Sequence, residues 1–177
     1  MKICIAVVSS TFFLAACGGS GGGSQASFST MESRGTALIE KLEGQSATPV
    51  SAMPSAGSAT YSGIAGFAPS IYDEVEVLSE ASLTANFASS TIAGNLTNFR
   101  DYQNTAIPGS VNIHSGVISG NEFGADLTGS LTVDGRASAV DGSMAGAFVG
   151  ANAGGVVGLI EGTVGSQYMV GVLGAEK

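Results

Sequence analysis

The chain has 177 residues, enough for one domain of ordinary size, and a formal net charge of −8. An acidic chain repels the phosphate backbone, so this charge argues against a nucleic-acid partner. Both cysteines, Cys4 and Cys17, lie near the amino terminus, so the rest of the chain cannot form a disulfide. The fold must therefore be held by packing and hydrogen bonds.

Residues 1–16 are predicted to be a lipoprotein signal peptide. Lys2 precedes a mostly apolar run that is too short to cross a bilayer as a helix but fits the core of an export signal. The run ends in Leu-Ala-Ala-Cys, which resembles the lipobox of bacterial lipoproteins and implies cleavage before Cys17 and acylation of that residue. The alternative is an ordinary signal peptide that leaves Cys17 as a free thiol. Gly18 after the cysteine implies forwarding to the outer membrane, so we expect a lipid-anchored protein of the bacterial outer membrane.

Residues 17–28 read as a flexible Gly/Ser tether, and residues 29–58 as a short helix followed by an extended connector. Ser29 and Glu32 have the spacing of a capping box, which predicts that the helix begins there. Because the domain follows directly, we expect the helix to cover one end of it; a mobile lid or a partner-binding helix is the alternative. One helical face holds Met31, Gly35, Leu38 and Leu42.

Residues 59–177 alternate apolar and polar side chains with a period of two, which is typical of half-buried antiparallel strands. Most connections are short, and Asp134-Gly135 is a strong hairpin signal. We predict an all-β fold, an eight-stranded antiparallel up-and-down β-barrel with a short N-terminal helix, in which glycines relieve the curvature of the strands. The predicted strands are residues 59–67, 75–87, 91–99, 110–118, 122–133, 140–150, 155–164 and 167–174.

Three stretches carry a resemblance to a known family, and one of them is "SGNEFGADLTGSLTV", residues 119–133. "LTANFASSTIAGNLTNF", residues 83–99, and "GSMAGAFVGANAGGVVGLIEG", residues 142–162, resemble hairpins of the barrel domains of transferrin-binding protein B and related surface lipoproteins. The resemblance extends over about residues 59–175. It implies a surface lipoprotein whose soluble barrel binds a host protein, haem or a small solute, with iron acquisition as one such role. It also implies an outer-membrane receptor or an exporter as a partner.

Candidate ligand-binding residues lie in three predicted loops. The loops hold Tyr72, Arg100, Tyr102 and Asn121, and tyrosine and arginine are common interface anchors. His114 is a candidate axial ligand for haem; the alternative is a solvent-facing strand histidine. It is the single histidine of the chain, so a metal site built on two or three histidines is excluded. We predict no cofactor.

Other functions are less well supported by the sequence. The densest acidic cluster lacks the spacing of a calcium loop and reads as a solvated strand face. The G-x-S-x-G match at residues 18–22 lies in the tether, without the strand and helix that a nucleophile motif requires, and no phosphate-loop motif is present, so we predict a protein that is not an enzyme. An integral outer-membrane barrel would show aromatic girdles, whereas this chain has no Trp and four Tyr. The remaining alternative is a structural or export-dependent envelope lipoprotein without a small-molecule ligand. The acidic cluster is Asp73, Glu74, Glu76 and Glu80.

Overall fold

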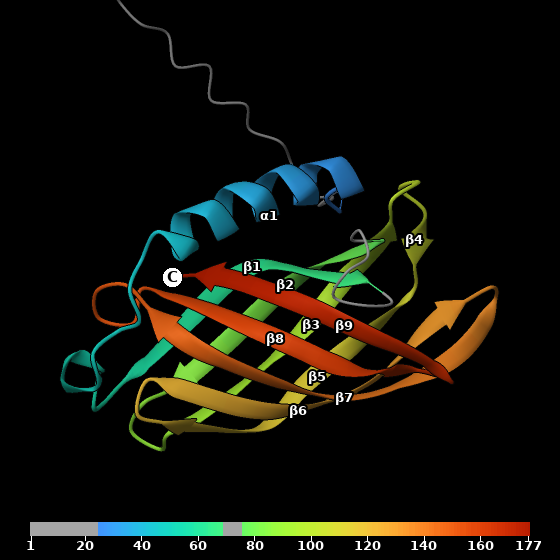
Figure 1. Ribbon diagram of the computed structural model, residues 1–177. Helices are drawn as coiled ribbons and strands as arrows, with labels where there is room; N and C mark the ends of the chain where they lie inside the picture. Colours follow the sequence, from blue (N-terminus) through green and yellow to red (C-terminus); the bar gives the residue numbers. More distant parts are fainter. Residues whose placement is uncertain (1–24, 69–75) are drawn as a thin grey trace, which may run out of the picture.

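A computed structural model describes residues 25–68 and 76–177 and confirms the predicted eight-stranded barrel (Figure 1). Helix α1 (Phe28–Glu43) and a 3₁₀ turn, η1 (Val50–Ala52), precede the sheet. A two-residue strand, β4 (Ala106–Ile107), pairs only with β3 and is an addition to the predicted set. The barrel strands are β1 (Ser58–Ala68), β2 (Val77–Asn86), β3 (Thr91–Asp101), β5 (Gly109–Ser119), β6 (Glu122–Val133), β7 (Arg136–Val149), β8 (Gly155–Val164) and β9 (Gln167–Glu176).

The barrel closes because its last strand pairs with its first. β9 runs antiparallel to β1 from the Ser62–Glu176 pair to the Ala68–Val170 pair. Every other barrel strand is also bonded on both sides to its sequence neighbours, with β3 pairing to β5 across the loop that carries β4. Closure satisfies the backbone groups that an open sheet would leave at its edges.

The observed strand bounds lie close to those predicted, except at the start of β7. This strand begins at Arg136 rather than at residue 140. Asp134 and Gly135 both have positive φ, 50° and 73°, and form the two-residue turn that pairs Val133 directly with Arg136. Such a turn matches the twist of the strands, so pairing continues up to the turn itself.

Helix α1 begins earlier than the capping box predicted. Ser27 is the N-cap, and its Oγ accepts a hydrogen bond from the backbone N of Thr30 at 3.2 Å. The backbone N of Phe28 donates to Asn104 Oδ1 at 2.9 Å, so a barrel loop satisfies another free donor of the first turn. The assignment of Ser29 as the cap was therefore wrong.

The helix lies along the outer wall of the barrel (Figure 1). Our expectation that it covers one end of the domain was therefore wrong. Its predicted apolar face is confirmed at Met31 and Leu42, which are buried, and at Gly35, which lies directly over Ile64 of β1. Ile64 and Leu78 point outward from their strands, and their contacts with Phe28 and Met31 form a small core outside the barrel. The helix packs on this part of the wall because the outward-facing side chains there are apolar.

The end of the barrel at the left of Figure 1 carries the β7–β8 loop, residues 150–154. Aromatic side chains fill the interior at this end. The Phe148 ring lies 5.4–5.9 Å, between centroids, from the rings of Phe123, Phe87 and Tyr61. The Tyr61 hydroxyl donates to the carbonyl of Ala153, in the β7–β8 loop, at 2.8 Å. Ala153 is itself buried, so this loop closes the end of the barrel, which we call the sealed end.

We predict that Tyr61→Phe lowers the free energy of unfolding at neutral pH by about 1–3 kcal/mol, because it leaves the buried Ala153 carbonyl without a donor. Burial also raises the pKa of Tyr61 from 10.0 to about 12. As pH rises above 10 the unfolded phenol loses its proton before the native one. The stability that this shift contributes is therefore complete below pH 10 and is lost as pH rises towards 12.

The measurement is urea denaturation of wild type and Tyr61→Phe at neutral pH and between pH 9 and 12. Wild type should lose stability more steeply than Tyr61→Phe in the alkaline range. Tyr168→Phe is the matched control, since Tyr168 is exposed and makes no hydrogen bond through its hydroxyl among the described residues. Identical alkaline slopes for wild type and Tyr61→Phe would contradict the assignment.

Candidate functional site at the open end of the barrel

In the described part of the chain, the end of the barrel opposite Ala153 contains a cavity of about 250 Å³, and we call it the open end. Its deep wall is made of inward-facing side chains that are almost fully buried, and its rim is made of half-buried ones. The deep residues are Phe67, Leu96, Phe99, Val111 and Leu131, and the rim residues include Val77, Ile107, Val133, Val164 and Met169.

The cavity exists because the side chains at this end are smaller. At the sealed end three aromatic rings meet Phe148, whereas here, in the described part of the chain, Phe67 and Phe99 form the one aromatic contact, with 6.0 Å between ring centroids. The other inward positions hold Val, Leu, Ile or Met. Side chains that project inward from eight strands must fill the barrel, and at this end they leave space.

The lining is apolar, with polar groups confined to its mouth. Glu76, Gln167 and Tyr168 are exposed at the mouth, and among the described residues no histidine, cysteine, lysine or arginine lines the cavity. Pockets that enclose drug-sized ligands measure roughly 300–1,000 Å³, so this cavity suits a smaller molecule or a single large side chain. The arrangement supports binding of an apolar group.

Tyr102 and Arg100 lie at this end but outside the cavity. Tyr102 is 66% exposed, and its backbone N donates to the carbonyl of Glu76 at 3.0 Å, which places it beside the mouth. Arg100 Nη1 donates to the carbonyl of Asn104 at 3.1 Å. Because Asn104 also accepts from Phe28, Arg100 braces the β3–β4 loop against the start of α1.

Asn121 and His114 are not brought to this end. Asn121 lies in the β5–β6 turn at the sealed end, where its Nδ2 donates to the carbonyl of Thr48 at 2.8 Å and fastens the connector after α1. His114 sits on the outer face at a bulge of β5, with Nδ1 2.9 Å from Ser115 Oγ and Nε2 3.0 Å from Thr128 Oγ1. Both ring nitrogens are thus engaged with hydroxyl groups away from the cavity.

Two predicted site residues, Cys17 and Tyr72, lie outside the described residues. The cavity residues themselves were not singled out from the sequence. The signal that placed them inside the barrel was the period-two alternation, as at Leu127, Leu131 and Val133, but alternation predicts an inward direction and not an unfilled space.

Two further searches concern only residues 25–68 and 76–177. Nowhere in these ranges do three or more His, Cys, Asp or Glu side chains gather in a way that could hold a metal ion. No helix there has the length and apolar character needed to cross a membrane.

Comparison with known proteins agrees with the fold and defines the family. The model of the family described as the C-lobe and N-lobe beta barrels of Tf-binding protein B matches residues 53–177. The chain therefore belongs to this family of transferrin-binding-protein barrels. No curated protein matches the sequence.

The chain is also similar to solved structures of transferrin binding protein B. Isotype 1 transferrin binding protein B from serogroup B Neisseria meningitidis is 19% identical, with a TM-score of 0.52 over 73% of this chain and 28% of that chain. A double mutant of transferrin binding protein B, a vaccine antigen from Haemophilus parasuis Hp5, is 22% identical, with a TM-score of 0.49 over 73% of this chain and 27% of that chain. The chain spans less than a third of these proteins, and the likeness concerns the fold.

Proposed function

We propose that this protein is a lipid-anchored surface lipoprotein whose barrel binds a small, largely apolar solute at its open end. The observation that carries the proposal is the contrast between the two ends, one sealed by aromatic rings and Ala153 and the other hollow with an apolar wall. Burying apolar surface contributes about 25 cal/mol per Å², so such a cavity favours an apolar guest. Membership of the transferrin-binding-protein barrel family and the lipobox at Cys17 support the surface role.

The proposed solute is smaller than haem. The cavity of about 250 Å³ lies below the range of pockets that enclose drug-sized ligands, and haem is larger than most of these. His114, the candidate axial ligand, is on the outer face of β5. A role in iron acquisition would then proceed through a solute or a partner protein rather than through haem held in the barrel. The cavity also favours ligand binding over an envelope lipoprotein that binds nothing.

A host protein is the second candidate, because two tyrosines are exposed at the same end. Tyr102 is 66% exposed and Tyr168, at the mouth, is 55% exposed. Large aromatic side chains of this kind are frequent anchors of protein interfaces. In this function an apolar side chain of the host protein would enter the cavity, and an outer-membrane receptor or exporter would be a further partner.

We predict that Val164→Phe abolishes binding of an apolar solute, because the larger ring occupies the cavity. The probe is N-phenyl-1-naphthylamine, a neutral fluorophore whose emission rises in apolar surroundings. Wild type should show saturable enhancement and Val164→Phe should lose it. Val117→Phe is the matched control, since Val117 is 60% exposed on the outer face of β5. Undiminished binding by Val164→Phe, or none by wild type, would contradict the proposed solute site.

Variants at the two exposed tyrosines, together with Val164→Phe, separate the solute from the host protein as the ligand. Tyr102→Ala, at a residue outside the cavity, should leave fluorophore binding unchanged if the solute alone is recognised. If a host protein is the ligand, immobilised wild type should capture it directly, with transferrin as the first protein to test. Capture should then be weakened by Tyr102→Ala, by Tyr168→Ala and by Val164→Phe.

We further predict that Cys17→Ala releases the protein from the membrane fraction, because stable anchoring by lipid requires acyl chains that only Cys17 can carry. Fractionation of the host cells measures this, and a mass spectrum of the mature amino terminus should show the acyl groups. Cys4→Ala is the control and should remain anchored, since the signal peptide is removed. A Cys17→Ala protein that stays in the membrane fraction would refute lipid anchoring.

A further inference from the structure

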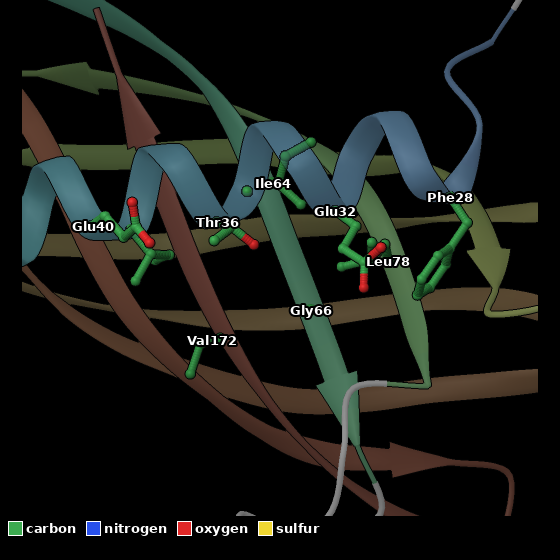
Figure 2. Close-up of a pocket in the computed structure, with 10 residues that line it drawn as sticks. Phe28, Glu32, Thr36, Glu40, Ile64, Gly66, Leu78 and Val172 are labelled. Atoms are coloured by element: carbon green, nitrogen blue, oxygen red, sulfur yellow. The ribbon is translucent and has the colours of Figure 1, made fainter.

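A hollow runs along one edge of α1, between the helix and the outer wall of the barrel. It comprises a cavity of about 320 Å³ near the start of the helix and one of about 740 Å³ near its end. Ile39 and Val172 line both, so the two hollows adjoin, and together they are called the trough. Figure 2 shows the first part, in which Glu32, Thr36 and Glu40 of the helix project toward the strands and Val172 faces them from β9.

The floor of this trough is an outer face of the sheet, and its side chains are apolar although they are exposed. Leu159 of β8 and Val172 of β9 are register partners and are 62% and 46% exposed. Ala145, the partner of Leu159 on β7, and the Val157–Ala147 pair continue the surface without a polar side chain. On β6 the outward positions near the middle of the strand are polar, as at Asp126 and Thr128. A contiguous apolar patch on a water-facing wall is typical of an interaction site.

The edge of α1 that faces away from the trough is held to the barrel by ion pairs. Arg34 Nη1 lies 3.3 Å from Glu80 Oε1, and Lys41 pairs with Glu176. Both basic residues of the helix are therefore turned toward β2 and the end of β9. These contacts fix the helix over the wall and leave the opposite edge without a positive charge.

The edge over the trough is acidic. Glu32, Glu40 and Glu43 line it from the helix, and Glu122 lines it from β6. Within the described part of the chain none of these four carboxylates forms an ion pair. The remaining described cations lie at the barrel ends: Arg100 and Arg136 at the open end, and Lys177 at the sealed end, where it donates to Asn152.

This charge distribution selects among possible occupants. A second copy of the chain would bring its own carboxylates against these, and an anionic lipid surface would be repelled as well. Complementary charges steer association and set specificity, whereas the apolar floor supplies buried area. The occupant that matches both features has apolar side chains flanked by lysine or arginine.

We propose that the trough is a docking site for an amphipathic, basic segment of a partner protein. Apolar side chains of that segment cover Val172 and Leu159, and its cationic groups pair with Glu32, Glu40 and Glu43. The site is separate from the cavity at the open end, so it does not depend on the proposed solute.

The test uses the lipid-free mature chain and a short synthetic peptide with Leu at helical spacing and Lys between. Binding is measured by fluorescence anisotropy, and its position by NMR shifts at the methyl groups of Val172 and Leu159. The triple variant Glu32→Gln/Glu40→Gln/Glu43→Gln, and separately Leu159→Ser, should each weaken binding about tenfold or more, in keeping with loss of a central contact. Added salt should weaken wild-type binding.

Matched controls are Glu161→Gln and Val117→Ser, which remove an exposed carboxylate and an exposed apolar side chain outside the trough. Both should bind like wild type, and a peptide with Glu in place of Lys should not bind. The proposal is overturned if the Leu/Lys peptide fails to bind, or if the trough variants bind it as well as the controls do. Binding of N-phenyl-1-naphthylamine at the open end should be unaffected by the triple variant, so failure of one proposal is distinguishable from failure of the other.

Discussion

The close approach of neighbouring strands at inward-facing glycines is the constraint on which the barrel depends. Gly142 of β7 and Gly162 of β8 are register partners that face the interior. A Cβ at Gly162 would lie 2.5 Å from the carbonyl oxygen of Asp141, and one at Gly142 would lie 2.5 Å from that of Glu161. No side chain fits at either position, so the strands coil tightly where other residues would force them apart. Larger neighbours such as Met144 and Ile160 fill the interior instead.

Tight coiling and closure give the molecule its two unlike ends and its outer wall. The interior is filled where Phe148 contacts three other rings. It leaves a cavity at the other end, where most inward residues are Val, Leu, Ile or Met. Because each of the eight barrel strands pairs on both sides, the wall offers side chains rather than backbone to a partner. Helix α1 packs on part of that wall, and the trough lies on the part beside the helix. The solute site and the docking site therefore follow from one architecture.

The strands could be predicted from the sequence because their signal is local. Alternation along segments such as residues 122–133, together with the Asp134-Gly135 turn, depends on neighbouring residues alone. Placement of the helix depended on contacts distant in sequence. Ser27 became the cap because Asn104 meets the next residue, and the outer wall holds α1 because Ile64 faces outward there.

The candidate site was less predictable. A cavity is the difference between the volume of a barrel and the side chains that eight strands place inside it, and no single segment contains that information. Arg100 and Asn121 were singled out for residue type, yet their hydrogen bonds show that they fasten a loop and the connector. The trough arises from Leu159 and Val172 on separate strands together with the acidic edge of a helix far from them in sequence.

The stability of Gly162→Ala measured against Gly124→Ala tests the account most directly. Gly124 faces outward from β6, and a Cβ there would lie 3.8 Å from its nearest neighbour, the carbonyl oxygen of Met144, which is ordinary contact. Overpacking in a tight interior costs typically about 1–3 kcal/mol, so Gly162→Ala should lower the free energy of unfolding by that amount while Gly124→Ala stays near wild type. Equal stabilities of the two variants would show that close strand approach at the inward glycines does not hold the barrel together.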